Sequence, residues 1–262
     1  MAVMNQEASL QLEIADLSMS FGGIQAIRGV SFGVKKGEIY SIIGPNGAGK
    51  TTIFNCISGI YRAKTGSIRF ESRELIGLKP DRIAQLGISR AFQNIALFKG
   101  MTVLDNLMSA RVHLMKYGLI GAAVYLGRCL REEVQNRDEV EDVIEFLDLQ
   151  PVRKSPVGSL SYGLQKRVEL ARALAMKPKL MLVDEPVSGM NLEEREDMAR
   201  YIIDINEERD ITVILIEHDM GLVMDLSDRV TVLNFGTKIA EGVPGEVSRN
   251  PGVVQAYLGE AG

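Results

Sequence analysis

A glycine-rich segment near residue 50 has the residue types that bind phosphate. It reads GPNGAGKT and consists of Gly44, Pro45, Asn46, Gly47, Ala48, Gly49, Lys50 and Thr51, followed by Thr52. The glycines allow the backbone to curl so that successive N–H groups point at phosphate oxygens, and a helix beginning near Lys50 adds the positive end of its dipole. The Lys50 side chain can reach the β- and γ-phosphates, and the Thr51 hydroxyl is a ligand for Mg²⁺. The segment therefore predicts binding of a nucleoside triphosphate, without indicating which reaction follows.

Two acidic residues further along the chain could complete this chemistry. Asp184 and Glu185 follow the apolar run LMLV at residues 180–183. In an open α/β sheet, a buried strand ending in acids places them where ligands bind, beside the phosphate loop. We expect Asp184 to hold Mg²⁺ through water and Glu185 to orient or deprotonate the attacking water. An acidic pair can also simply cap the next helix, but the intact glycine-rich segment favours the catalytic interpretation.

The surrounding pattern predicts a sheet that presents both groups at one edge. Alternation and short apolar runs predict strands at residues 12–21, 26–34, 38–43, 180–183, 211–216, 229–234 and 238–241, with a Gly22–Gly23 turn after the first. Helical spacing predicts helices at residues 50–58, 102–116, 132–149, 192–206 and in the segment after Ser161, with a short helical tail. The helix–strand alternation after Ser161 favours a largely parallel sheet covered by helices.

Composition excludes several classes of protein. The chain has 262 residues with a formal net charge of −4, which suits one large α/β domain and disfavours nucleic-acid binding. Its two cysteines, Cys56 and Cys129, form no CxxC pair, so reduced thiols in a cytosolic protein are the simpler interpretation. Residues 1–10 lack the features of a secretory signal, and the apolar run Tyr117–Leu126 is far shorter than the roughly 20 residues of a bilayer crossing. We expect a soluble chain that reaches membranes only through a partner.

Further motifs resemble those of the ABC (ATP-binding cassette) ATPases, in the order that this family uses. Residues 160–164 (LSYGL) are similar to the family's signature LSGGQ, and Gln93 lies where the family has a Mg²⁺-sensing glutamine. Residues 188–191 (SGMN) resemble the loop that bridges the two ATP sites. His218 matches the switch histidine that contacts the γ-phosphate, and Phe21 occupies the place of the aromatic residue that stacks on adenine. The resemblance covers essentially the whole chain.

The resemblance implies an α/β fold of the ABC ATPase type, in which a P-loop core carries an N-terminal antiparallel β subdomain and an inserted α-helical subdomain. Residues 1–262 would form a single domain, with residues 1–92 and 177–262 as the nucleotide-binding core and residues 93–176 as the helical subdomain that carries the signature. The cofactors implied are ATP and Mg²⁺, and the reaction is hydrolysis of ATP to ADP and phosphate.

Roles for individual residues also follow from the resemblance. Lys50, Glu185 and His218 would be catalytic, and Thr51, Gln93 and Asp184 would serve the metal. Ser161 and Gly163 would face the γ-phosphate bound by an opposing subunit, so that each site is completed by two chains. Tyr162 and Leu164 replace the usual glycine and glutamine of the signature, and Asn191 replaces the usual aspartate of the bridging loop. These departures bear on communication between sites and leave the catalytic groups intact.

The family resemblance also implies partners. They are integral-membrane permease subunits, a second ATPase subunit in a homodimer or a paralogous heterodimer, and indirectly an extracytoplasmic solute-binding protein, with no nucleic acid. The chain would lie in the cytoplasm at the inner face of the cell membrane, and residues 117–126 would contribute to the surface that receives a permease loop.

The residues around the motifs indicate which subfamily the chain resembles. Residues 90–94 (RAFQN), 97–103 (LFKGMTV) and 257–260 (YLGE), together with the tyrosine in the signature, are similar to the larger ATPase subunit of branched-chain amino acid importers. Related amide or urea importers share this pattern. An ATPase of a lipid or lipopolysaccharide exporter has similar length and motif order, but the tyrosine signature and the long middle segment count against it. A DNA-repair ABC ATPase would need heptad arms or zinc cysteines, and a non-hydrolysing switch would lack Glu185, His218 or the signature.

Overall fold

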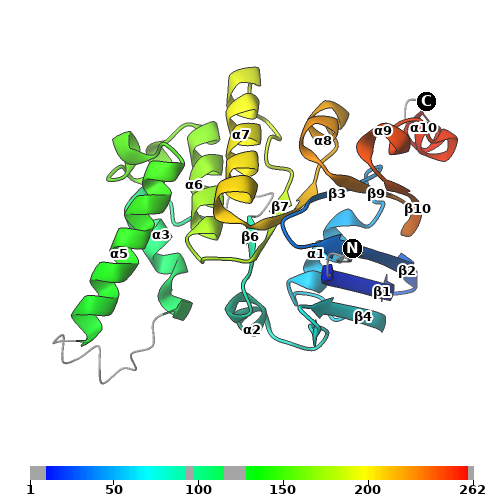
Figure 1. Cartoon of the computed structure of the whole chain (residues 1–262), viewed down its shortest axis with the longest axis horizontal. Coiled ribbons are helices and arrows are strands. Elements are labelled where there is room, and N and C mark those ends of the chain that lie inside the picture. Colours follow the sequence, from blue (N-terminus) through cyan, green and yellow to red (C-terminus); the bar gives the residue numbers. More distant parts are fainter. Residues whose placement is uncertain (1–9, 92–96, 115–127, 259–262) are drawn as a thin grey trace, which may run out of the picture.

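The computed structural model describes residues 10–91, 97–114 and 128–258. Its main sheet has six strands in the order β10-β9-β3-β8-β7-β6, and neighbours are parallel except for β10 and β9 (Figure 1). The strands are β3 (Ile39–Ile43), β6 (Ile88–Ala91), β7 (Leu180–Asp184), β8 (Thr212–Ile216), β9 (Arg229–Asn234) and β10 (Thr237–Gly242). Every residue of β3, β7 and β8 is buried, which explains why these strands are almost entirely apolar.

A second sheet is antiparallel and has the order β2-β1-β4-β5. Its strands are β1 (Leu10–Phe21), β2 (Ile24–Lys35), β4 (Thr65–Phe70) and β5 (Arg73–Glu74). Helix α1 (Lys50–Ile57) lies between this sheet and the main one (Figure 1). Side chains of both sheets and of α1, such as Leu12, Phe54 and Ile214, form one buried cluster. Burial of these apolar faces therefore fixes the first helix after the glycine-rich segment.

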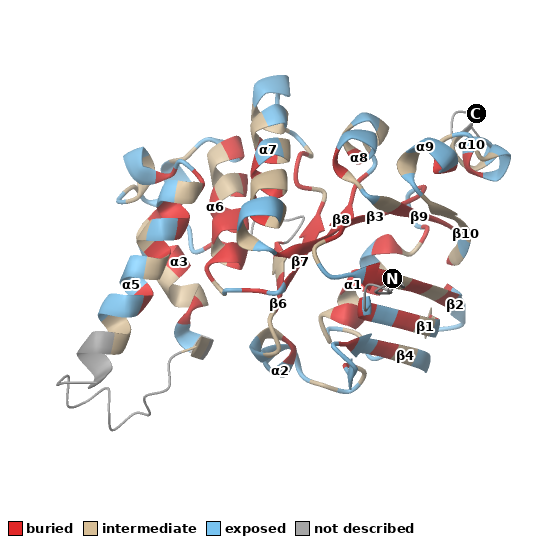
Figure 2. Ribbon diagram, in the orientation of Figure 1, coloured by how far each residue is buried: buried red, intermediate tan, exposed pale blue. Residues whose placement is uncertain are grey.

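The other helices cover the main sheet and extend beyond it. They are α2 (Pro80–Gln85), α3 (Val103–Ala110), α5 (Arg128–Phe146), α6 (Tyr162–Leu174), α7 (Leu192–Arg209), α8 (Met220–Leu226), α9 (Pro244–Val247) and α10 (Pro251–Leu258), with 3₁₀ turns at Val112–Leu114, Gln150–Val152 and Val157–Ser159. Helices α3, α5 and α6 stand together on the β6 side of the molecule, with their buried faces turned inward (Figure 2). Their apolar residues join those of β7 in a second buried cluster. No helix within the described ranges combines the length and apolarity that a bilayer crossing requires.

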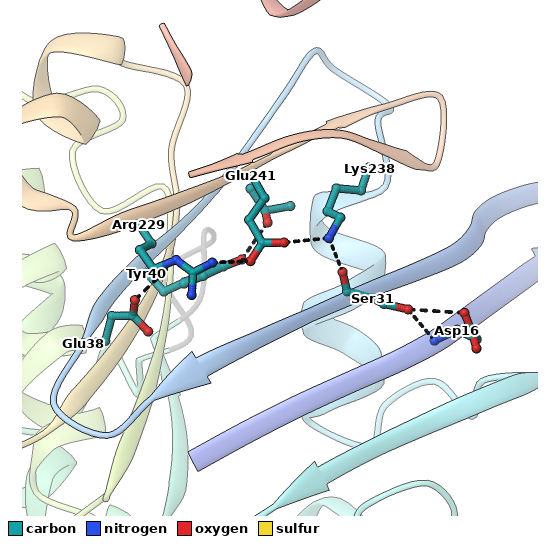
Figure 3. Close-up of polar contacts among 8 residues, drawn as sticks. Asp16, Ser31, Glu38, Tyr40, Arg229, Lys238 and Glu241 are labelled. Atoms are coloured by element: carbon teal, nitrogen blue, oxygen red, sulfur yellow. Dashed lines mark hydrogen bonds and ion pairs between the residues drawn. The ribbon is translucent and has the colours of Figure 1, made fainter. Parts of the chain in front are cut away.

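Polar contacts tie the β9–β10 hairpin to the antiparallel sheet (Figure 3). Arg229 donates to Glu241 at 2.8 Å and lies 3.9 Å from Glu38. The ammonium group of Lys238 donates both to Glu241 and to the backbone carbonyl of Ser31 on β2, each at 2.6 Å. The hairpin is therefore held in place on the side where it meets β2.

The turn of this hairpin supports the glycine-rich segment. The backbone N–H of Gly236 donates to the Ala48 carbonyl at 3.1 Å, and the Gly236 carbonyl accepts from the Arg28 N–H at 2.8 Å. A three-way backbone contact thus joins β2, the hairpin turn and the loop that precedes α1.

These features confirm the predicted α/β class, with an antiparallel N-terminal sheet and a helical part. Several boundaries were wrong. The helix expected at residues 102–116 ends as α3 at Ala110 and is followed by the 3₁₀ turn Val112–Leu114. Between them, the buried guanidinium of Arg111 donates to Asn136 at 2.8 Å and to the Ala175 carbonyl at 2.6 Å. The pattern also missed β4, β6, α2 and α8, which are short and lack a long periodic signal. Residues 117–126 and Gln93, both assigned roles above, lie outside the described residues.

Candidate active site

The loop between β3 and α1 has a backbone shape that requires glycine. Gly44 has φ +144°, and a Cβ there would overlap the carbonyl oxygen of Leu233. Gly49 has φ +103°, and a Cβ would lie 2.8 Å from the Ala26 carbonyl oxygen. Both positions combine a left-handed conformation with a close backbone neighbour, so any side chain would displace the loop. The sequence motif is therefore matched by a tightly constrained curl that opens directly into α1.

Lys50 lies within this curl. Its side chain is buried, and its ammonium group donates to the carbonyls of Gly44 at 2.6 Å and Pro45 at 3.0 Å. These bonds keep the ammonium group at the start of α1. A phosphate bound by the loop would meet a cation already in place.

A cavity of about 290 Å³ opens beside the loop. Its lining consists of Ala26, Asn46, Gly47, Ala48, Gly49, Lys50, Thr51, Thr52 and Glu185. All but Ala26 and Glu185 belong to the glycine-rich segment and the start of α1, whereas Glu185 follows the distant strand β7. The structure therefore brings residues 46–52, expected to bind phosphate, and the expected general base into one cavity. The other expected site residues that the structure describes do not line it; they are Phe21, Gly44, Pro45, Ser161, Gly163, Asp184 and His218.

Asp184 ends β7 and is 2% exposed. Its Oδ2 accepts a hydrogen bond from Arg90 at 2.8 Å, and its Oδ1 has no hydrogen-bond partner among the described residues. Burial raises the pKa of this carboxyl, and Arg90 opposes that effect. A buried carboxylate oxygen without a partner is costly, and it is the kind of hard oxygen that Mg²⁺ or a Mg²⁺-bound water takes as a ligand. The site therefore fits the expected cation.

Arg90 was missed as a functional residue by the sequence analysis, which used it only as part of the RAFQN segment and gave it no role of its own. It lies on β6, and besides Asp184 it donates to the side-chain oxygen of Asn55 on α1 at 2.6 Å. Its guanidinium also lies over the Phe54 ring, 5.5 Å from the centroid. Arg90 thus links β6 and β7 to the helix that begins at the phosphate loop, and it orients the carboxyl group of Asp184.

Replacing Arg90 by Met should destabilise the protein by about 3–5 kcal/mol at neutral pH, because it leaves Asp184 ionised, buried and without its cation. Chemical denaturation measures the loss. The loss should shrink as the pH falls, because protonation of Asp184 removes the unpaired buried charge. The part of the loss that comes from the contacts of Arg90 with Asn55 and Phe54 should remain. The matched control is Arg82→Met, which breaks an exposed 4.0 Å pair with Asp81 and should change stability by less than about 0.5 kcal/mol. Equal losses in the two variants would contradict the assignment.

Glu185 and His218 follow neighbouring strands. In the parallel pairing of β7 with β8, Asp184 is opposite Ile216, so the segments that continue into Glu185 and His218 leave the sheet side by side. Glu185 has φ +48°, and its backbone N–H donates to the Ile216 carbonyl at 2.9 Å. The His218 side chain is 58% exposed. Both segments thus begin at the carboxyl edge of the sheet, which is where the sequence pattern predicted Glu185.

The signature segment and the bridging loop contact each other within the chain. The Tyr162 ring lies against Gly189, where an added Cβ would be 3.2 Å from the ring and would sit at φ +77°. The Glu194 carboxylate lies against Gly163 so closely that a Cβ there would overlap it. Tyr162 is thus accommodated by a glycine in the facing loop, a relation that single motifs do not reveal.

Helix caps fix the ends of these two segments. Ser161 caps α6, and its hydroxyl accepts from the Leu164 N–H at 3.3 Å. Asn191 caps α7 in a reciprocal capping box with Glu194, with bonds of 2.9 and 3.2 Å. The neutral Asn191 therefore keeps the capping function that an aspartate would perform.

Phe21 ends β1 and is 41% exposed. Its ring meets the Tyr61 ring edge-to-face, with centroids 5.0 Å apart and an interplanar angle of 70°. Phe21 thus remains partly exposed at the end of β1, where the resemblance places the aromatic residue that stacks on adenine. Gln93, expected near the metal, is not among the described residues.

Comparisons with known proteins agree with this geometry. A family model described as ABC transporter matches residues 27–188, and one described as branched-chain amino acid ATP-binding cassette transporter matches residues 237–262. The chain is 40% identical to the high-affinity branched-chain amino acid transport ATP-binding protein BraF of Pseudomonas aeruginosa, over 95% of this chain and 98% of that protein. It is 39% identical to the protein LivG of Escherichia coli, with the same coverage.

A solved structure gives the same result. The ADP conformation of MJ1267, an ATP-binding cassette of an ABC transporter, superposes with a TM-score of 0.83 at 32% identity, covering 96% of this chain and 99% of that one. The sequence match covers more than half of the chain, and the fold match covers nearly all of it. The chain belongs to the ABC transporter family.

Proposed function

We propose that this chain is the ATP-hydrolysing subunit of an importer of branched-chain amino acids. The observation that carries the ATPase assignment is the cavity in which Glu185 from β7 meets the phosphate loop and Lys50. The branched-chain assignment is supported by the match of residues 237–262 and by the names of the relatives.

In the proposed mechanism, the protein positions groups and offsets charge. The backbone N–H groups of the loop and the ammonium group of Lys50 bind the phosphates, and Lys50 exchanges its carbonyl partners for phosphate oxygens. Thr51 and Asp184, together with Gln93, would hold Mg²⁺, which offsets the charge that develops on the phosphoryl group. Glu185 orients and deprotonates the attacking water, and His218 faces the γ-phosphate.

The whole chain acts as a single ABC ATPase domain in this proposal, with residues 93–176 as its helical subdomain. Permease subunits hold it at the inner face of the membrane. A hollow of about 450 Å³ between β6, α3 and α6 is lined by Arg90, Ser109, Ala110, Val112, Glu169, Arg172, Ala173 and Met176. Val112 is an exposed apolar residue at its rim, and the segment 117–126 follows closely in the chain. This surface is our candidate for the permease loop, and crosslinking from a single cysteine at position 112 to the permease tests it.

The import function is tested by uptake of labelled leucine. Cells that lack this chain should lose high-affinity uptake, wild-type protein should restore it, and the Glu185→Gln variant should not. Undiminished leucine uptake, combined with loss of uptake of another solute, would retain the ATPase assignment and reject the substrate.

The completed site should need two chains, because the signature residues Ser161 and Gly163 lie outside the cavity that holds Lys50 and Glu185. A mixture of Lys50→Ala and Ser161→Glu variants forms dimers in which one site carries both lesions and the other carries none. If the chain works as a homodimer, mixing should restore part of the wild-type hydrolysis rate, while each variant alone remains inactive. If it needs a paralogous subunit, activity should return only when that subunit is added. Full activity of a proven monomer would contradict the shared site.

A further inference from the structure

Glu217 is a buried carboxyl group to which the proposed mechanism gives no role. It lies between the end of β8 and His218, and its exposed fraction is 0%. Its Oε2 accepts hydrogen bonds from the backbone N–H groups of His218 at 2.7 Å and Asp219 at 3.1 Å. Its Oε1 has no hydrogen-bond partner in the part of the chain that the structure describes. A carboxyl group in such a place costs free energy, so its presence beside the site calls for a physical reason.

The imidazole of His218 provides that reason. Its Nδ1 lies 3.4 Å from Oε2 of Glu217, while the side chain as a whole is 58% exposed. One edge of the ring therefore lies close to a buried carboxyl, while the side chain remains largely exposed. The 3.4 Å separation is an ion-pair distance, and a hydrogen bond from Nδ1–H to Oε2 requires the ring to turn slightly toward the carboxylate.

The segment that carries the pair is held from two sides. The Asp219 carboxylate caps α8 by accepting from the Leu222 N–H at 3.1 Å, and it also forms an ion pair with Arg195 on α7. The backbone at residues 217–219 therefore has little freedom, and the remaining variable is the rotation and tautomer of the His218 ring.

The charged groups around Glu217 come from several elements. Burial raises its pKa, and the backbone N–H groups of His218 and Val187 oppose that effect by favouring the ionised form. Glu185, which follows β7, acts in the same direction as burial, and His218 opposes it. The buried ammonium of Lys166 on α6 also interacts with Glu217. The Glu217 carboxyl thus interacts with the segment after β7, which carries the expected base, with α6, and with its own neighbour His218.

We propose that Glu217 is a positioning residue for His218. It accepts a hydrogen bond from Nδ1–H and so fixes the ring orientation and the tautomer in which Nε2 is free to exchange a proton at the nucleotide site. A buried carboxyl that orients a histidine in this way is a general device of hydrolytic and metal sites. The role of Nε2 rests on the proposed ATPase function, whereas the tautomer does not.

A competing explanation is that Glu217 only binds the backbone N–H groups of the turn. In that case its carboxyl would be indifferent to the His218 side chain, and removing it would have the same effect whether or not the imidazole is present. The two explanations therefore differ in a measurable coupling between positions 217 and 218.

Nuclear magnetic resonance tests the tautomer directly. The chain has only 2 histidines, so long-range ¹H–¹⁵N spectra of the full-length protein contain two sets of ring signals, which a His113→Gln variant assigns. At about pH 8, where imidazole is ordinarily neutral, the His218 ring should carry its proton mainly on Nδ1. In Glu217→Gln the proton should move mainly to Nε2. A wild-type ring protonated mainly on Nε2 would overturn the proposal, and this result needs no variant of Glu217.

Single-turnover hydrolysis tests the function of the pair. Glu217→Gln should slow the chemical step by about 10–100-fold, the usual cost of losing a group that orients a histidine, and should leave the Kd for ATP unchanged. In a His218→Ala background the same change should have no further effect. An equal slowing in both backgrounds would show a structural role and reject the proposal. If neither the wild-type protein nor any variant hydrolyses ATP, the proposed ATPase function is rejected, whereas the result on the His218 tautomer still stands.

The matched control is Glu38→Gln, which neutralises a second buried glutamate whose pKa burial also raises. Glu38 packs near Arg229, in the region where β3 and β9 begin (Figure 3). This variant should keep the wild-type tautomer of His218 and the wild-type rate. A change in either quantity would show that loss of any buried carboxyl perturbs the site, and would remove the support for a specific role of Glu217.

Folding of Glu217→Gln is checked by its Tm across a pH series. Burial raises the pKa of the Glu217 carboxyl in the folded protein above the ordinary 4.5, so folding favours the protonated form. The stability that this protonated carboxyl contributes is lost as the pH rises through the raised pKa. The neutral amide avoids this loss, so the Tm of the variant relative to wild type should increase from acid toward neutral pH.

Discussion

Replacement of Glu185 by Gln should reduce ATP hydrolysis by about 10²–10⁴-fold, the usual contribution of general base catalysis. The amide keeps the shape of the side chain at the edge of the phosphate cavity but cannot accept the proton of water. Asp184 and its ion pair with Arg90 are untouched, so the affinity for ATP and Mg²⁺ should remain near the wild-type value. Single-turnover hydrolysis and ATP titration measure the two quantities separately.

The same variant should also trap the ATP-bound dimer, because the nucleotide that holds the two chains together is no longer consumed. An ATP-dependent increase in apparent mass on size-exclusion chromatography is the expected sign. The control is Glu193→Gln, which changes an exposed glutamate in the first turn of α7 and should leave hydrolysis unaltered. Wild-type turnover in Glu185→Gln would require a different base.

Replacement of Lys50 by Ala should raise the Kd for ATP by at least about 10²-fold. Hydrogen bonds to charged groups are worth about 1.5–3 kcal/mol each, and a factor of ten in affinity corresponds to about 1.4 kcal/mol. Lys50 would make such bonds to the β- and γ-phosphates from a position already fixed at the start of α1. The loop contains no second lysine or arginine that could take over this role.

Fluorescence titration with ATP measures this loss, and titration with ADP refines it. ADP lacks the γ-phosphate, so its affinity should fall less than that of ATP. Lys64→Ala, at an exposed position before β4, is the control and should bind both nucleotides as the wild type does. Wild-type ATP affinity in Lys50→Ala would reject the assignment of the cavity as the phosphate site.

The sequence by itself determined the class of the fold and indicated the residues proposed for its chemistry. The phosphate loop could be predicted because its glycines meet local demands: Gly44 and Gly49 occupy left-handed conformations next to backbone atoms. Strands β3, β7 and β8 could be predicted because strands buried on both faces have nearly continuous apolar sequences. The placement of Glu185 near the loop followed from the rule that parallel strands deliver their carboxyl ends to one edge.

Only the tertiary structure revealed the groups that act through distant neighbours. Arg90 lies on a four-residue strand, and the sequence does not indicate its partner. It becomes important because strand pairing brings it to Asp184, 94 residues away. Tyr162 departs from the usual signature, and its accommodation became visible only when the folded chain placed Gly189 beneath its ring.

The role of Glu217 is also invisible in the sequence, although its partner His218 is the next residue in the chain. The sequence does not indicate that the Glu217 carboxyl is fully buried or that it reaches the imidazole. Burial and side-chain direction depend on which elements pack over the end of β8, and that packing is decided by contacts with α6, α7 and the segment after β7. The local sequence pattern indicates the backbone conformation and the secondary structure that a residue favours. The cost of burying a charge and the partner that offsets it are properties of the assembled core.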